Sequence, residues 1–332
     1  MTETVSSKRK DWLDALRGIM IILVILVHTI PSESHVWYVY NTLIGPIMIP
    51  MFFVISGYVF NGRGGNQLVF YKNLLRKLII PSFVLFWGIR VPLIPFKGVS
   101  YFISNSFKFI SGETHWYIIA CIIAEIIFFY NLKFCKNTLS VCLTACACCV
   151  AGFLMDHWNI GHFAMINRAF IAQFFLVIGF VFRKYEENIQ RLRWPVITIG
   201  GLIYIAMTVA TFYYWPQQSI DVHLNKYYNI PYCFSLILIV CLFLMTCGSK
   251  IGKSSKILAL IGRHTLSIYL LHGFCTSLGK RFLPLDSTNV IILLLKVLVI
   301  TVFALFICTL FSIVLNYIWP EIMGRPRKKT QS

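Results

Sequence analysis

Long apolar stretches recur along this chain, and short polar or charged segments separate them. A helix needs about 20 mostly apolar residues to cross the hydrocarbon core of a bilayer. The pattern therefore predicts an all-α integral membrane protein with about ten transmembrane helices in one bundle. The expected spans are 12–31, 41–60, 78–96, 115–131, 138–155, 167–182, 195–214, 230–248, 264–279 and 289–318. The last of these is long enough to tilt in the bilayer.

The composition excludes the other broad classes. Hydrophobic residues make up 58% of the 332 residues, charged residues only 13%, and the mean hydropathy is +0.75. A soluble domain carries about 25% charged residues, so a soluble, disordered or collagen-like chain is excluded. The 11 cysteines include a run at 142–149 without zinc-type spacing, so we expect small apolar side chains there and no metal site.

The net charge of +18 indicates membrane topology rather than nucleic-acid binding. If the N-terminus is cytoplasmic, 21 of the 30 Lys and Arg residues fall in cytoplasmic segments, 6 on the opposite side and 3 within spans. Cytoplasmic loops of membrane proteins are enriched in Lys and Arg, so this split predicts cytoplasmic termini. We expect a tail at 1–11, a membrane domain at 12–318 and a basic tail at 319–332. Since the loops are short, the chemistry must lie in the bundle or at its faces.

Ionisable residues inside spans are costly and usually functional, and the first span holds Asp14, Arg17 and His28. Arg17 and His28 are 11 residues apart in sequence. In an α-helix this spacing puts them on one face, with directions that differ by about 20° around the helix axis and positions about 16 Å apart along it. Asp14 lies one turn before Arg17 and can form an ion pair with it. Two interpretations stay open: interfacial residues near the span ends, or an anion-binding Arg17 and a proton-transferring His28.

Glu125 lies in the middle of a span, where a carboxylate must be paired, protonated or in a wet cavity. His115 and Trp116 open the same span, either as part of an interfacial aromatic belt or as substrate-binding residues. Ser56 is a further candidate substrate contact, although small-residue helix packing would also explain it. As an acyl-carrying nucleophile it would need an adjacent base. His272 is a further candidate, although packing would also explain it.

A basic group precedes the third span in FYKNLLRKLIIP, which contains Lys72, Arg76 and Lys77. Positive charge on a cytoplasmic loop would explain it. A clamp for the phosphates of a cytoplasmic ligand would explain it as well.

In three blocks the sequence resembles membrane acyltransferase family 3, which includes O-acetyltransferases of O-antigen and other surface polysaccharides. They are LDALRGIMIILVILVH, then IPMFFVISGYVF followed by FYKNLLRKLIIP, and IGRHTLSIYLLH; THWYIIACIIAEI also looks like a segment of the family. The resemblance spans about residues 11–318. It implies a ten-helix bundle in a bacterial inner membrane that transfers an acyl group from acyl-CoA, commonly acetyl-CoA, to a sugar hydroxyl of a surface polysaccharide or its lipid-linked precursor.

The resemblance also implies roles for individual residues. Arg17 and His28 match the functional pair of the family, and Arg76 matches the second Arg of an Arg-x-x-Arg pattern. Asn73 stands at the first Arg position, so Lys72 or Lys77 would have to compensate. Two other classes of function stay open: a transporter or flippase for a lipid-linked sugar, and a non-catalytic membrane module of the same family.

Overall fold

The computed structural model describes residues 10–60, 66–214, 255–287 and 289–324. Within these ranges all regular structure is helical, with no strand. The first half contains α1 (Asp11–Thr29), α2 (His35–Val59), α3 (Gln67–Leu74), η1 (Leu75–Ile79), α4 (Ile80–Arg90), η2 (Val91–Leu93), α5 (Ile94–Lys97), α6 (Val99–Ser111) and α7 (Trp116–Phe134). The second half contains α8 (Thr138–His157), η3 (Phe163–Met165), α9 (Ile166–Lys184), α10 (Glu186–Arg191), α11 (Arg193–Tyr214), α13 (Lys256–Arg263), α14 (Thr265–Phe282) and α15 (Val290–Ile318).

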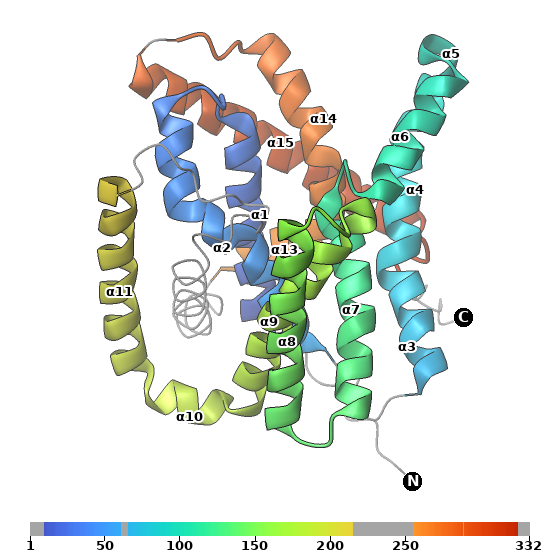
Figure 1. Cartoon of the computed structure of the whole chain (residues 1–332). Helices are drawn as coiled ribbons and strands as arrows, with labels where there is room; N and C mark the ends of the chain where they lie inside the picture. Colours follow the sequence, from blue (N-terminus) through green and yellow to red (C-terminus); the bar gives the residue numbers. More distant parts are fainter. Residues whose placement is uncertain (1–9, 61–65, 215–254, 288, 325–332) are drawn as a thin grey trace, which may run out of the picture.

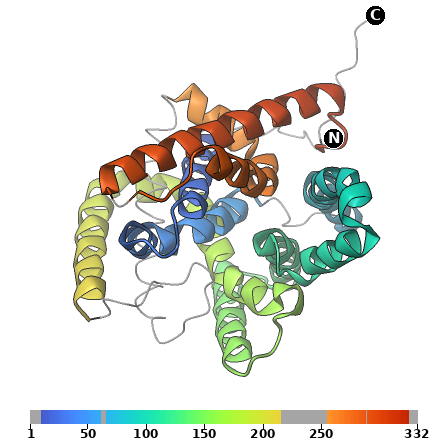
Figure 2. The same ribbon diagram turned by 90° about the horizontal axis from the view of Figure 1, so that it is seen from above.

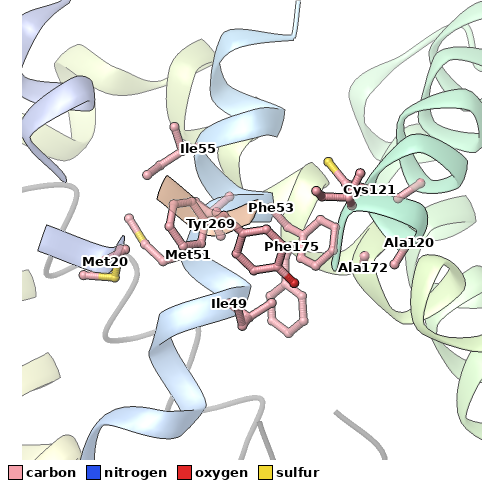
Figure 3. Packing of buried hydrophobic residues seen from close by; sticks show 14 of the residues in the cluster. Met20, Ile49, Met51, Phe53, Ile55, Ala120, Cys121, Ala172, Phe175 and Tyr269 are labelled. Atoms are coloured by element: carbon pink, nitrogen blue, oxygen red, sulfur yellow. The ribbon is translucent and has the colours of Figure 1, made fainter. Parts of the chain in front are cut away.

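The centre of the bundle is built around α1, α2 and α9 (Figure 1). The first helix contacts α2, α13, α14 and α15, while α9 contacts α2, α7 and α8. Seen from above, α15 runs along one side of the bundle beside α14 (Figure 2). Side chains from α1, α2, α7, α9 and α14 form one continuous apolar core, in which Met51, Phe53, Cys121, Phe175 and Tyr269 lie (Figure 3).

Two pairs of glycines allow the central helices to touch backbone to backbone. A Cβ on Gly262 of α13 would overlap the carbonyl oxygen of Asp14 in α1, and a Cβ on Gly18 would overlap that of Leu258. Between α2 and α9, Gly57 and Gly179 play the same part. Small residues at helix crossings are typical of membrane bundles, because van der Waals packing replaces the hydrophobic effect as the force between helices.

Seven helices of the described ranges are long and apolar enough to cross a membrane, or up to eight if the bent pair α13–α14 is one span. They are α1, α2, the continuous rod Gln67–Lys97, α7, α8, the segment Phe163–Lys184 and α15. The bend between α13 and α14 is 82°. The expected span at 195–214 coincides with α11, which is outside this set, and the expected span at 230–248 lies outside the described residues.

The structure corrects the expected third span. It is a rod of 31 residues that begins at Gln67 rather than at residue 78, so Lys72, Arg76 and Lys77 lie on a helix and not on a loop. Within the rod, Leu75–Ile79 is π-helical. Pro81 explains this, because it has no N–H to donate to the carbonyl of Lys77 four residues earlier.

The segment between the third and fourth spans was expected to be a short loop, and it contains the 13-residue helix α6. Val99, Ile103, Phe107 and Ile110 recur at helical spacing along α6, and all four side chains are exposed. This stripe is too short to be recognised as a span. Since residues three and four apart share a helix face, it nevertheless has the pattern of an amphipathic helix.

Candidate functional site

Chemistry-bearing side chains gather at two levels along α1. We call the end of the bundle where α1 begins the Lys10 end, and the opposite end, where α1 finishes, the His28 end. At the Lys10 end, Lys10 Nζ donates to Glu186 Oε2 at 2.7 Å, and Tyr58 Oη donates to the same oxygen at 2.6 Å. These contacts tie the start of α1 to the last turn of α2 and to α10, and so fix the helix that carries Arg17 and His28.

Asp14 is the centre of an ion-pair cluster one turn further along α1. Its side chain is almost completely buried, with 2% exposed. Arg17 Nη1 lies 3.3 Å from Asp14 Oδ1, and Arg263 Nε lies 3.6 Å from Asp14 Oδ2. Arg263 also pairs with Asp11 at 3.1 Å. The sequence predicted the pair with Arg17, which is confirmed, but gave no signal for Arg263, because that contact depends on the close packing of α13 on α1.

Glu125, one of the predicted catalytic residues, lies on α7. The charges of Arg17 and Lys77 both act on its carboxylate. One turn earlier, the thiol of Cys121 lies 4.0 Å from Glu125 Oε1, and the side chains of Ser56 and Tyr117 lie close enough to influence this thiol. Glu125 on α7 therefore lies within electrostatic reach of Arg17 on α1 and of Lys77 on the rod, although 108 residues separate it from Arg17 in sequence.

Ser56, a predicted substrate contact, lies beside the thiol of Cys121, and no hydrogen bond in the described part of the chain joins its hydroxyl to a base. A serine needs a neighbouring base to act as a nucleophile. The geometry therefore favours a packing or binding role for Ser56 over an acyl-carrying one.

The predicted donor-binding residues Lys72, Arg76 and Lys77 have exposed side chains. Lys72 lies on α3, while Arg76 and Lys77 lie in the π-helical turn η1. The turn at Gly324 packs directly against the backbone of Arg76 and Lys77, where Gly324 has a φ of +70° and no room for a Cβ. The chain segment after α15 thus lies beside the basic residues.

At the His28 end, three histidines from separate elements come together. The rings of His28 and His272 have centroids 5.1 Å apart and are tilted by 44°. His272 is buried, and its Nδ1 lies 2.7 Å from the carbonyl oxygen of Tyr269. The Tyr269 ring in turn lies 5.9 Å from that of His115. His28 itself is exposed at the end of α1, so it is the member of this cluster that can reach a ligand.

His115 has an unusual backbone conformation, with a φ of +55° immediately before α7. A non-glycine residue in this region is strained, and such strain is often found at functional sites. Its ring packs against Phe86 at 5.7 Å and Phe109 at 5.9 Å. The ring of the next residue, Trp116, has a different neighbour: the guanidinium of Arg168 lies 4.6 Å from its centroid.

A pocket of about 440 Å³ opens beside His28. It lies between the end of α1, the turn into α2 and the end of α14. Its lining residues are Val27, His28, Ile30, Pro31, Ser32, Glu33, Trp37 and Lys280. Lys280 Nζ donates to the backbone carbonyl of His28 at 2.9 Å. Sequence reasoning missed Lys280, because it reads as one of a few charges after a span, and only the packing of α14 on α1 brings it to His28.

Among the described ranges, no group of three or more His, Cys, Asp or Glu residues is arranged to hold a metal ion. The site therefore consists of an ion-pair cluster with neighbouring exposed cations at one level of α1, and a histidine cluster with an open pocket at the other. Helix rise separates Arg17 from His28 by about 16 Å.

The family comparison is decisive for the type of activity. The model of the acyltransferase domain of membrane acyltransferase family 3 matches residues 10–316. The chain belongs to this family. No curated protein and no solved structure matches the chain. Membership in the family, together with the candidate membrane spans, makes the protein a multi-pass membrane acyltransferase.

The match of the acyltransferase domain contains both levels of the site, from Asp14 and Arg17 to His272. All of the predicted site residues fall within it: His28, Arg17, Asp14, Glu125, Arg76, Lys72, Lys77, His115, Trp116, Ser56 and His272.

Proposed function

We propose that this acyltransferase is an O-acyltransferase of a bacterial inner membrane. It moves an acyl group, by default acetyl, from acyl-CoA to a sugar hydroxyl of a cell-surface polysaccharide or its lipid-linked precursor. One observation carries the proposal within this acyltransferase family. An exposed histidine, backed by a second histidine, stands beside an open pocket on the same uninterrupted helix as Arg17.

The donor approaches from the Lys10 end. Lys72, Arg76 and Lys77 are exposed cations, and they suit the phosphates of coenzyme A. Asn73 stands where the family pattern has its first Arg, and Lys72 and Lys77 supply positive charge on either side of it. Arg17 is the next cation inward, and its charge reaches Glu125. From there a pantetheine arm extends along α1 toward His28, over about 16 Å of helix rise.

The transfer is an attack of a sugar oxygen on a thioester carbon. The imidazole of His28 takes the hydroxyl proton as the oxygen–carbon bond forms, because a neutral histidine is a base near neutral pH. The tetrahedral intermediate then collapses, the carbon–sulfur bond breaks, and the leaving thiolate takes up the proton that His28 carries. His272 holds the His28 ring from behind, with its own Nδ1 fixed by the Tyr269 carbonyl.

The proposal is tested by removing the base and the inner cation separately. General acid–base groups contribute about 10²–10⁴-fold to a rate, so His28→Ala should lower acyl transfer by that factor while the protein still inserts. Mass spectrometry of surface glycans from cells that carry wild type, His28→Ala or Arg17→Ala gives the readout. A shift of one acetyl mass that is lost in both variants supports the O-acetyltransferase.

Other outcomes of this experiment are equally informative. A shift by another acyl mass keeps the mechanism and changes the donor. Normal acylation by a well-inserted His28→Ala protein would refute the assignment of His28 as the base. Glycans of unchanged mass that no longer reach the cell surface would replace the enzyme with a transporter of a lipid-linked sugar.

A further inference from the structure

The pocket beside His28 has a rigid rim. Residues 31–34 form a turn in which Ser34 N donates to the Pro31 carbonyl at 3.0 Å and Ser34 Oγ donates to the same oxygen at 2.7 Å. Ser34 also caps α2 by accepting from Trp37 N at 3.1 Å. These bonds fix the turn between α1 and α2 and hold Trp37 in place. A binding site is most effective when it is formed before the ligand arrives.

Three side chains give the pocket its chemical character. Trp37 is half-buried and packs its indole against the small apolar cluster of Ile30, Leu293 and Val297. Glu33 is exposed, and its Oε1 accepts from Ser32 Oγ at 3.1 Å. The Lys280 ammonium uses one hydrogen-bond donor on the His28 carbonyl. An ammonium group has three donors, so two remain for a ligand.

This set of groups fits a sugar ring. A pyranose presents apolar C–H faces and a rim of hydroxyls, so it needs an aromatic surface, a hydrogen-bond acceptor and a hydrogen-bond donor. Small-molecule sites in general combine an aromatic or apolar wall with a few fixed polar groups. Trp37, Glu33 and Lys280 provide the three kinds of contact, and His28 stands on the same wall.

We propose that the pocket between the end of α1, the turn at 31–34 and the end of α14 is the binding site for a pyranose acceptor. Trp37 is the stacking surface, and Glu33 and Lys280 bind ring hydroxyls so that another hydroxyl meets His28. This inference rests on the proposed function for its role as acceptor site, but sugar binding itself is measurable without acyl transfer. The acceptor consequently enters at the His28 end, opposite the basic residues of the rod Gln67–Lys97.

The test measures sugar binding directly. Saturation-transfer difference NMR is run on the full chain in nanodiscs of sugar-free phospholipid, with methyl glucosides, galactosides, mannosides and rhamnosides as probes. We expect at least one pyranoside to show ring-proton signals, and Trp37→Leu and Glu33→Gln each to reduce those signals several-fold. Two variants are used because Trp37 also packs against apolar neighbours, whereas Glu33 lies on the surface.

Matched controls lie elsewhere on the chain. Trp158 is an exposed tryptophan at the end of α8, with 62% of its surface accessible. Glu113 is an exposed glutamate that also accepts a serine hydroxyl, from Ser111 at 3.2 Å. Trp158→Leu and Glu113→Gln should leave the pyranoside signals unchanged.

Two results would overturn the pocket assignment: no signal from any of the pyranosides, or signals that persist in both pocket variants. The release of free CoA from acetyl-CoA is measured on the same samples. Acyl-CoA turnover without sugar binding in the pocket leaves the acyltransferase proposal intact and removes this inference. Sugar binding that depends on Trp37 and Glu33, with no use of acyl-CoA, keeps the site and removes the proposed function.

Discussion

Single residues show how this membrane domain tolerates charge in its interior. Asp14 is buried, yet it contacts Arg17 on its own helix and Arg263 on α13. Burying a carboxylate without such partners would cost several kcal/mol. The arrangement gives Asp14 a positioning role, since it fixes Arg17 and joins α1 to α13. The side chain of Arg17 is 26% exposed, so it is accessible to a ligand.

The two aspartates of α1 allow this role to be tested. Asp14→Asn leaves two arginines beside a neutral group and should destabilise the protein by roughly 2 kcal/mol, as expected for a charged contact at a buried site. Asp11→Asn removes a carboxylate that is 63% exposed and pairs with the same Arg263. Exposed pairs contribute only about 0–1 kcal/mol, so this variant serves as the control.

Thermal unfolding of both variants in the same nanodiscs gives the comparison. A clear decrease in Tm for Asp14→Asn with little change for Asp11→Asn is the expected result. Equal Tm values for the two variants would show that burial of Asp14 adds nothing to the ion pair. A loss of acyl transfer in Asp14→Asn beyond the loss of folded protein would point to the fixed position of Arg17.

At the scale of elements, the site depends on places where two helices cross at a glycine, so that their backbones are in direct contact. Gly262 brings α13 against α1, and so brings Arg263 to Asp14. Gly262→Ala should force the two helices apart and destabilise the protein by about 1–3 kcal/mol, the usual cost of overpacking. Gly88 of α4 has open space around its missing Cβ, so Gly88→Ala should cause no loss of Tm.

Thermal unfolding also checks this prediction, with acyl transfer as a second readout. If Gly262→Ala leaves both Tm and activity unchanged, then the close approach of α1 and α13 is not required. A matching decrease in both glycine variants would indicate a general effect of alanine in these helices rather than a crossing point.

The π-helical turn η1 is a second element with a testable role. Pro81→Ala supplies the N–H that Pro81 lacks, which favours a regular α-helical turn over Leu75–Ile79. That change rotates Arg76 and Lys77 relative to α4. If these residues bind the donor, the KM for acyl-CoA should rise several-fold while kcat changes little, because binding is lost equally in ground and transition states.

Pro95 provides the control for this variant. It lies in the first turn of α5, where a missing N–H costs nothing, so Pro95→Ala should leave the KM for acyl-CoA unaltered. An unchanged KM in Pro81→Ala as well would exclude the π-helical turn as part of the donor site.

The sequence could predict the features that depend on residues near one another in the chain, but not those that depend on the packing of distant helices. The apolar length of α1 and the spacing of Arg17 and His28 are local, so the sequence predicted them. The start of the rod at Gln67 was missed because its first turns are polar, and α6 was missed because its apolar stripe is shorter than a span. Lys280 and Arg263 were missed as site residues because their contacts depend on helix packing, for which a single sequence carries no signal.

On the scale of the whole molecule, helices differ in how much of their surface the protein itself covers. In α2, 75% of the most apolar stretch is buried, but in α8 and α15 the shares are 22% and 28%. The outer surfaces of α8 and α15 are nevertheless apolar, with exposed side chains such as Leu143, Val150 and Phe306. Lipid tails are the environment that such surfaces require, so these helices form part of the lipid-facing perimeter.

The two ends of the molecule should therefore lie on opposite sides of a bilayer, and their charge predicts which side each faces. The turn between α7 and α8 lies at the Lys10 end, where Lys184 contacts Thr138, and basic ends face the cytoplasm. The turn between α8 and η3 lies at the other end of α8.

An epitope inserted between Cys135 and Lys136 should react with antibody only in permeabilised bacterial cells. An epitope inserted between Asn159 and Ile160 should react in intact spheroplasts. Reversed labelling would place the proposed donor-binding residues away from cytoplasmic acyl-CoA. Labelling of both epitopes on one side would show that α8 does not cross the membrane.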